Sequence, residues 1–315
     1  MNLKGCELLL TKPRGFCAGV DRAIGIVNRA IEMFDEKIYV KHEVVHNKNV
    51  IEELTKKGVE FIESIEEIPD KSILIYSAHG VSKEVSNIAQ RKDLKIFDAT
   101  CPLVTKVHIE IHKYALTNTD VILIGHYGHP EVEGTMGQYN SHKGKIHLIE
   151  NIYDAEKLDI KNDKIAYVTQ TTLSVDDTKN IINYIKTKYP NIIGPRKDDI
   201  CYATQNRQEA VKKILNYCDC LIVVGSQNSS NSQRLKEIAI QDGKRAYLID
   251  HESQLDISCL RNRKVIGITA GASAPEHTVQ SIIKYLVAEG AKISTEQIEF
   301  KQEAVTFSLP KSLRK

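Results

Sequence analysis

Short apolar runs alternate with amphipathic stretches along the whole of this 315-residue chain. The runs are four to six residues long and rich in Ile, Leu and Val, as is typical of strands buried in parallel sheets. The amphipathic stretches, such as 20–34, 176–189 and 207–217, are predicted to be helices. This alternation predicts α/β units with mainly parallel sheets. The predicted strands are 7–10, 37–40, 72–76, 94–97, 120–125, 164–168, 191–194, 220–225, 245–249 and 265–269.

A longer repeat groups these elements, because strand, loop, cysteine and helix occur in that order three times. The three copies are "LLLTKPRGFCAGVDRAIGIV", "LKIFDATCPLVTKVHIEI" and "NIIGPRKDDICYATQNRQEAVKKI", and two further strand-loop-helix crossings follow each. We therefore predict an α/β fold of three similar lobes, arranged as a pseudo-threefold trefoil around a central cavity. The predicted lobes are 15–100, 101–196 and 1–14 plus 197–288, with a C-terminal tail at 289–315.

Charge and composition narrow the possible partners. Lys and Arg total 43 and Asp and Glu 41, a net charge of +2, which argues against a nucleic-acid binder or a membrane-surface binder. No run of about 18 apolar residues is present, and charged residues interrupt the first twenty positions, so neither a spanning helix nor a secretory signal is expected. Seven cysteines without an export signal favour a reducing cytoplasm.

Three of the cysteines occupy equivalent places in the repeat. Cys17, Cys101 and Cys201 each stand where a predicted helix begins. The partial positive charge of a helix start favours a thiolate, the form that ligates metals. The remaining cysteines lack this setting, and we interpret them as structural: Cys6, Cys218, Cys220 and Cys259.

Three thiolates from three lobes suit several kinds of site. A closed structural zinc site needs four ligands and commonly uses close C-x-x-C pairs, which are absent here. A catalytic zinc with an open position is possible. A [4Fe–4S] cluster with one iron lacking a protein thiolate fits better, because that iron can act as a Lewis acid. Three unrelated core cysteines remain the alternative that spacing alone leaves open.

Polar loops after the strands suggest an anionic ligand. They contain imidazoles, hydroxyls, amides and glycines but little Lys or Arg, a mixture that suits a phosphate or diphosphate at helix starts. Helix capping is the alternative for any one Ser, Thr or Asn, and zinc binding or buried hydrogen bonding for any one histidine. The candidates include His46, His79, His129, Thr171, Ser229, Ser230, Asn231 and Ser273.

Glu131 is the candidate proton donor. It follows His129 and Pro130 after the strand "VILIG", and burial beside a bound anion would raise the pKa of its carboxyl group. Thr171 could orient this carboxyl group or relay a proton to it. The nearby Glu133 competes for the role, although a solvated helix face suits it better.

The motifs together resemble one known family. The stretches "PRGFCAGVDRAI", "HEVVHN", "SAHGVS", "FDATCPLVTKVH", "GHPEVEGTMGQY", "TQTTLSVDDT", "GPRKDDICYATQNRQEAV", "GSQNSSNS" and "TAGASAP" resemble 4-hydroxy-3-methylbut-2-enyl diphosphate reductase, the LytB family. The resemblance runs from about residue 8 to about residue 288 with every motif in order. It implies a three-lobed α/β trefoil around one [4Fe–4S] cluster.

The resemblance also implies roles for particular residues. Cys17, Cys101 and Cys201 match the cluster ligands, and Glu131 matches the acid, with Thr171 as its partner near the substrate hydroxyl. His129 matches both the catalytic and the diphosphate-binding set. The other matches to the diphosphate site are His46, His79, Ser229, Ser230, Asn231 and Ser273.

The implied reaction is the reductive removal of an allylic hydroxyl group, giving isopentenyl and dimethylallyl diphosphates as the last step of the methylerythritol phosphate route. Its electrons would come from a ferredoxin- or flavodoxin-type protein. Two other functions stay open as alternatives: an iron–sulfur hydro-lyase without net reduction, and an iron–sulfur sensor that binds a metabolite.

Overall fold

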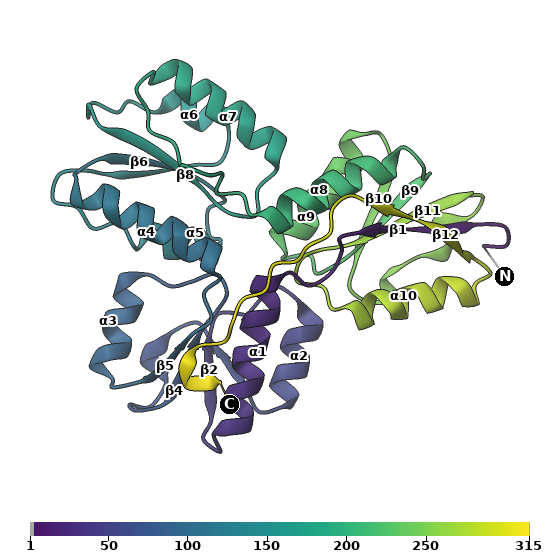
Figure 1. Cartoon of the computed structure of the whole chain (residues 1–315), viewed down its shortest axis with the longest axis horizontal. Helices are drawn as coiled ribbons and strands as arrows, with labels where there is room; N and C mark the ends of the chain where they lie inside the picture. Colours follow the sequence, from purple (N-terminus) through teal and green to yellow (C-terminus); the bar gives the residue numbers. More distant parts are fainter. Residues whose placement is uncertain (1–2, 315) are drawn as a thin grey trace. The chain divides into compact units, whose positions relative to one another are not determined.

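A computed structural model describes residues 3–314 and confirms the predicted α/β class. It contains three separate sheets of five, four and three strands, in which every pairing is parallel (Figure 1). By its internal contacts the chain forms two compact units. The first comprises the described parts of Met1–Val20, His46–Glu52 and Tyr202–Val305, and the second those of Asp21–Val45, Glu53–Cys201 and Thr306–Lys315. The predicted boundaries of the three lobes stay a prediction.

The first unit contains the five-stranded sheet, with strand order β10-β9-β11-β1-β12. The edge strand β12 lies within residues 289–315, which we predicted to be a C-terminal tail. Its elements are β1 (Glu7–Lys12), α8 (Tyr202–Leu215), β9 (Cys220–Val224), α9 (Ser230–Gln241), β10 (Arg245–Ile249), β11 (Val265–Ala270), α10 (Glu276–Ala288) and β12 (Lys292–Glu299).

Helices cover both faces of this sheet. Successive residues of a strand point to opposite faces, and in the central strands both sets are apolar and buried. Leu8 and Leu10 of β1 pack in a cluster with Ile282 and Leu286 of α10. The intervening Leu9 packs in another cluster with residues of α8 and α9. Figure 1 shows α10 on one side of the sheet and α8 and α9 on the other. The continuous apolar runs in the sequence reflect this two-sided burial.

The second unit contains two sheets, with strand orders β3-β2-β4-β5 and β7-β6-β8. Helices α1 (Ala18–Met33) and α2 (Lys48–Lys56) have residues in both units. The remaining elements are β2 (Ile38–Lys41), β3 (Glu60–Ile62), β4 (Ile73–Tyr76), α3 (Lys83–Arg91), β5 (Lys95–Asp98), α4 (Pro102–Leu116), β6 (Asp120–Ile124), α5 (Pro130–Met136), β7 (Ile146–Ile149), α6 (Ile152–Lys157), β8 (Ile165–Thr169) and α7 (Val175–Lys188).

One predicted strand is wrong. The stretch 191–194 forms only a single bridge, between Ile193 and Ala166. Pro190 and Pro195 flank it and lack the N–H groups that a longer ladder needs. The edge strands β3 and β7, which were not predicted, are three and four residues long and less buried than the central strands.

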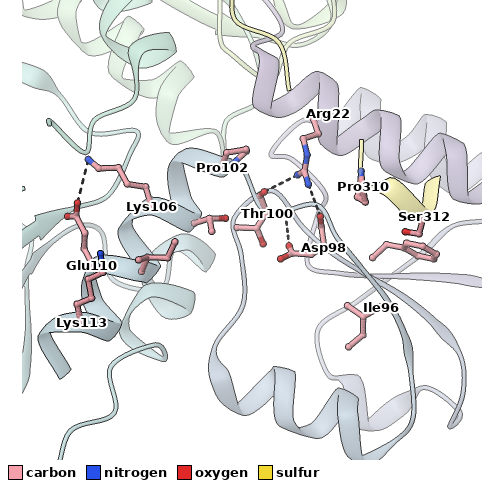
Figure 2. Close-up of a pocket in the computed structure, with 13 residues that line it drawn as sticks. Arg22, Ile96, Asp98, Thr100, Pro102, Lys106, Glu110, Lys113, Pro310 and Ser312 are labelled. Atoms are coloured by element: carbon pink, nitrogen blue, oxygen red, sulfur yellow. Dashed lines mark hydrogen bonds and ion pairs between the residues drawn. The ribbon is translucent and has the colours of Figure 1, made fainter. Parts of the chain in front are cut away.

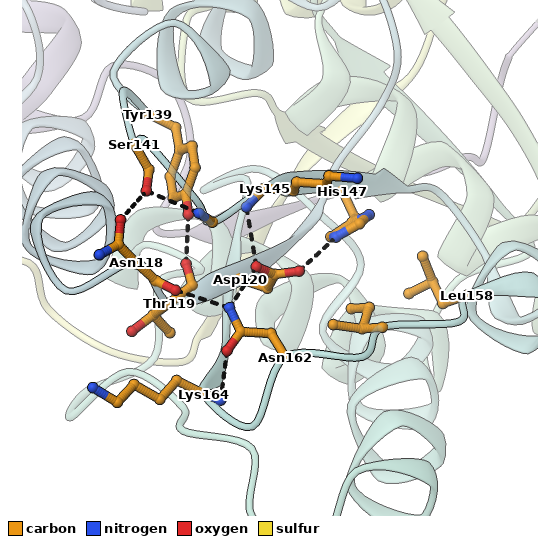
Figure 3. Close-up of polar contacts among 12 residues, drawn as sticks. Asn118, Thr119, Asp120, Tyr139, Ser141, Lys145, His147, Leu158, Asn162 and Lys164 are labelled. Carbon is orange, nitrogen blue, oxygen red and sulfur yellow. Dashed lines mark hydrogen bonds and ion pairs between the residues drawn. The ribbon is translucent and has the colours of Figure 1, made fainter.

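A polar network fixes the amino-terminal ends of β6, β7 and β8 (Figure 3). The buried carboxylate of Asp120 accepts hydrogen bonds from the Lys145 amide at 3.0 Å and from Asn162 Nδ2 at 2.8 Å, and His147 Nε2 lies 3.2 Å from it. Each partner belongs to the start of a neighbouring strand or to the loop before it. Asp120 therefore has a structural role, at the opposite end of the sheet from the loops that follow the strands.

None of the helices described between residues 3 and 314 has both the length and the apolar character that crossing a membrane requires.

Candidate functional site

Most of the predicted site residues lie after the carboxyl ends of parallel strands, in loops or in the first turn of the following helix, where open α/β sheets bind ligands. Cys201 is the exception, since it precedes α8 and its amide N–H donates to the Thr171 carbonyl oxygen at 3.1 Å. The first unit contains Cys17, His46, Ser229, Ser230, Asn231 and Ser273. The second contains His79, Cys101, His129, Glu131, Thr171 and Cys201.

In the first unit, the loop after β11 connects several of the predicted residues. Ala272 donates its amide N–H to Asn231 Oδ1 at 2.8 Å and accepts the Cys17 N–H at its carbonyl oxygen at 3.1 Å. Ser273 Oγ donates to the His46 carbonyl oxygen at 2.9 Å. The structure thus gathers the Cys17 turn, the start of α9 and the His46 loop around one short segment.

Ser229 is a helix cap, as the alternative interpretation of these loops allowed. Its Oγ accepts from the Ser232 N–H at 3.3 Å and lies 3.0 Å from Ser232 Oγ. A Cβ atom at Gly225 or Gly271 would lie 2.3 Å or 2.0 Å from Ser232 Oγ. These two glycines let the first turn of α9 lie directly against the ends of β9 and β11, with its amide groups at the site edge.

In the second unit, Thr171 holds the carboxyl group of Glu131 with two hydrogen bonds. The Thr171 N–H donates to Glu131 Oε1 at 2.6 Å, and Thr171 Oγ1 donates to Oε2 at 3.0 Å. Glu131 is only 4% exposed although it follows directly after the first residue of α5. Because Thr171 also accepts the amide of Cys201, it connects the predicted acid to a predicted cluster ligand.

Burial dominates the acidity of Glu131. Desolvation raises the pKa of its carboxyl group to about 7, although the two hydrogen bonds from Thr171 favour the ionised form. The negative charge of Asp199 adds a smaller upward effect. A carboxylic acid with this pKa can both hold and release a proton near neutral pH.

This pKa predicts a pH-dependent stability. A carboxyl group with a pKa of 4.5 in the unfolded chain and about 7 in the native protein binds more protons when folded, so stability falls as pH rises between these values. We expect the free energy of unfolding of the wild type to fall by about 2–3 kcal/mol relative to that of Glu131→Gln between pH 5 and pH 8. Denaturation of both proteins at several pH values measures this difference. Parallel pH profiles would show that Glu131 titrates normally.

Two predicted histidines lie beside this acid. His129 Nδ1 accepts the Glu131 N–H at 3.1 Å, so this nitrogen is unprotonated and Nε2 carries the proton of the neutral ring. The rings of His79 and His129 meet edge to face, with centroids 5.6 Å apart. Cys101 belongs to the same region, because its amide N–H donates to the Ala78 carbonyl oxygen at 3.0 Å, next to His79.

The chemistry of the three repeat thiols fits a metal cluster. Cys101 occupies the N-cap position of α4, yet its side chain makes no capping hydrogen bond. Cys17 and Cys201 immediately precede α1 and α8, and all three residues are only partly buried. Burial instead raises the pKa of the thiols of Cys6 and Cys218 to about 11 and that of Cys220 to about 12, so these three stay protonated.

The three repeat cysteines are divided between the two units. Cys17 belongs to the first unit, and Cys101 and Cys201 belong to the second. Between residues 3 and 314 no three His, Cys, Asp or Glu side chains are grouped closely enough to hold a metal ion. The convergence of the three thiols on one cluster therefore stays a prediction.

Sequence reasoning missed an ion pair beside Cys201. Lys106 Nζ lies 3.0 Å from Asp199 Oδ1, and Asp199 Oδ2 accepts the Thr169 N–H at 3.0 Å. The carboxyl group of Asp199 is fully buried, which raises its pKa to about 6. Two adjacent aspartates before the cysteine were visible in the sequence, but nothing there distinguished a buried carboxylate from a solvated one.

A groove of about 650 Å³ in the second unit lies beside the Cys101 turn (Figure 2). Thr100, Pro102 and Lys106 line it, together with Pro310 and Ser312 near the C-terminus. It contains neither Glu131 nor any of the three repeat cysteines. This groove is therefore separate from the residues that carry the predicted chemistry.

Comparison with known proteins agrees with these features. The family described as "LytB protein" matches residues 8–287. The 4-hydroxy-3-methylbut-2-enyl diphosphate reductases of Acinetobacter baumannii and Methylococcus capsulatus are 57% and 56% identical over 310 residues, covering 98% of this chain and 98% and 99% of theirs.

Solved structures give the same result. The E-1-hydroxy-2-methyl-but-2-enyl-4-diphosphate reductase of Plasmodium falciparum superposes with a TM-score of 0.93 at 41% identity, covering 98% of this chain and 96% of its own. An (E)-4-hydroxy-3-methyl-but-2-enyl diphosphate reductase, titled the terminal enzyme of the non-mevalonate pathway, superposes with a TM-score of 0.65 at 30% identity, covering 90% and 99%. The chain is an oxidoreductase and belongs to the LytB family.

Proposed function

We propose that this enzyme reductively removes the hydroxyl group of (E)-4-hydroxy-3-methylbut-2-enyl diphosphate, as the last step of isoprenoid precursor synthesis by the non-mevalonate route. The substrate takes up two electrons and two protons, its C–O bond breaks, and water leaves with isopentenyl or dimethylallyl diphosphate as product. Family membership supports the substrate. The single structural observation that carries the chemistry is the buried Glu131 carboxyl group held by Thr171.

One [4Fe–4S] cluster, held by Cys17, Cys101 and Cys201, would supply the electrons and an open iron that polarises the substrate hydroxyl group. The partly buried thiols at three helix starts support this ligand set, in contrast to the protonated thiols in the core. We expect a ferredoxin- or flavodoxin-type donor to deliver the electrons in the cytoplasm.

The diphosphate would be held by neutral donors. Ser229, Ser230 and Asn231 offer hydroxyl, amide and helix-start N–H groups. The Ser273 hydroxyl group would turn to the diphosphate from the carbonyl oxygen of His46, to which it donates in this structure. His79 and His129 would add imidazole donors. The tautomer of His129 supports this role, because its Nδ1 accepts from Glu131 and its protonated Nε2 can donate to a diphosphate oxygen.

Glu131 would give the proton that turns the departing hydroxyl group into water. Its pKa of about 7 keeps a substantial fraction protonated at neutral pH, and the two bonds from Thr171 stabilise the carboxylate left after proton transfer. Thr171 therefore positions the acid before the transfer and stabilises its conjugate base afterwards.

Anaerobic iron and sulfide analysis tests the cluster, and assays with a chemical reductant and the diphosphate substrate test the reaction. We expect about four irons and four sulfides per chain, and consumption of two electrons per product. Turnover without a reductant would favour a hydro-lyase. Binding of the substrate without turnover would favour a sensor, and a colourless protein containing zinc would contradict the cluster.

A further inference from the structure

Each of the three cysteine-headed helices carries a cation one to two turns beyond its cysteine. Arg22 follows Cys17 by five residues on α1, and Lys106 follows Cys101 by five residues on α4. Arg207 follows Cys201 by six residues on α8. A basic side chain near a helix start opposes the helix dipole. Lys106 and Arg207 also contact Glu110 and Ala203 of their own helices, at 4.0 and 2.9 Å.

Arg22 contacts the loop that leads to Cys101. Its Nη1 donates to the Thr100 carbonyl oxygen at 3.0 Å and its Nη2 to that of Asp98 at 3.2 Å (Figure 2). Its Nε donates to the Ser308 carbonyl oxygen at 3.1 Å. The planar guanidinium group therefore fixes the backbone immediately before Cys101 with two charge-assisted hydrogen bonds.

Lys106 contacts the loop that leads to Cys201. Its Nζ donates to the Lys197 carbonyl oxygen at 2.6 Å and lies 3.5 Å from that of Asp198. The buried Asp199 carboxylate, 3.0 Å away, holds the ammonium group in place. This segment is irregular, so the cation binds carbonyl groups that no regular hydrogen-bond ladder uses.

Arg207 contacts the loop that leads to Cys17. Its Nη2 and Nε donate to the Gly15 carbonyl oxygen at 2.7 and 3.2 Å, and Nη2 lies 3.5 Å from that of Phe16. The Arg207 side chain is 1% exposed and pairs with Glu303 at 3.1 Å. The carboxylate of Glu303 compensates the burial of this charge.

The three contacts follow one cyclic rule: the helix after each cysteine holds the backbone immediately before the next, in the order 17, 101, 201 and back to 17. In all three copies the cation stands five or six residues after the cysteine and donates to backbone carbonyl oxygens before another of the three cysteines. We propose that Arg22, Lys106 and Arg207 are positioning residues, which hold each cysteine turn in the conformation that ligates the cluster. This inference rests on the proposed cluster and deepens it by assigning the side chains that orient its ligands.

Iron release from the anaerobic holoprotein to a ferrous chelator, bathophenanthroline disulfonate, tests the proposal. Arg22→Met and Lys106→Met remove partly exposed cations. Because Lys106→Met leaves the buried Asp199 carboxylate without its partner, far-ultraviolet circular dichroism checks that this variant is folded. Arg207→Met would leave buried acceptors without a donor and risks the fold. We expect both variants to release iron roughly 10–100 times faster than the wild type, as when residues that orient metal ligands are removed. Lys106→Arg keeps the charge and the donors, and should restore slow release.

Arg29→Met is the matched control. Arg29 stands on the same helix as Arg22 and also donates to a carbonyl oxygen near the C-terminus, that of Leu313 at 3.2 Å, but contacts no cysteine loop. It should release iron at the wild-type rate and keep the electron paramagnetic resonance spectrum of the reduced cluster, while the spectra of Arg22→Met and Lys106→Met shift. Equal rates in all three variants would overturn the positioning role. A wild-type protein that binds no iron and sulfide would instead overturn the cluster itself.

Discussion

Glu131→Gln should lower turnover by about 10²–10⁴-fold, the usual contribution of a general acid, while the cluster and substrate affinity are retained. Glutamine has the same shape, and its Oε1 can still accept the Thr171 N–H that Glu131 accepts at 2.6 Å. It cannot release a proton to a leaving hydroxyl group. The loss should therefore appear in kcat, with little change in KM, because the groups proposed to hold the diphosphate are unaltered.

Glu133→Gln provides the control for this experiment. Glu133 lies on the same short helix but is exposed, so neutralising it should leave turnover close to that of the wild type. Steady-state assays with a chemical reductant, together with iron analysis of each protein, separate a chemical defect from cluster loss. Wild-type turnover in Glu131→Gln, or an equal loss in Glu133→Gln, would remove Glu131 from the acid role.

Much of the fold could be predicted because both faces of each sheet are covered. Leu8, Leu9 and Leu10 are all buried, so the strand reads as an uninterrupted apolar run. One strand prediction failed because backbone hydrogen bonding, and not side-chain composition, limited the strand. Residues 191–194 have the composition of a strand, but the prolines on either side limit them to one bridge.

The site residues could be proposed from their place after the strands, but their connections could not. No sequence pattern shows that Thr171 donates twice to Glu131 and also accepts from Cys201. The cyclic contacts of Arg22, Lys106 and Arg207 were equally hidden, because each joins segments 78 to 192 positions apart. The sequence shows only that each cation stands five or six residues after a cysteine.

Cys101→Ser and Cys201→Ser should each abolish cluster retention and with it essentially all reductive turnover. A serine hydroxyl group ionises far less readily than a thiol, so it is a poor ligand for iron. The fold itself should survive, because both cysteines are only partly buried and the Cys101 thiol makes no capping bond whose loss would weaken α4. Iron and sulfide content, with far-ultraviolet circular dichroism as the measure of folding, distinguishes ligand loss from unfolding.

Cys218→Ser and Cys220→Ser should behave in the opposite way. Both thiols are buried in the first unit, where replacing a thiol by the more polar hydroxyl group costs about 1–3 kcal/mol of stability. We therefore expect a lower melting temperature but a full complement of iron and an unchanged turnover per cluster. Loss of iron from these two variants, with retention in Cys101→Ser, would show that Cys218 and Cys220 hold the iron and that Cys101 does not. It would mean that the helix starts of the repeat do not select the thiolates that ligate iron.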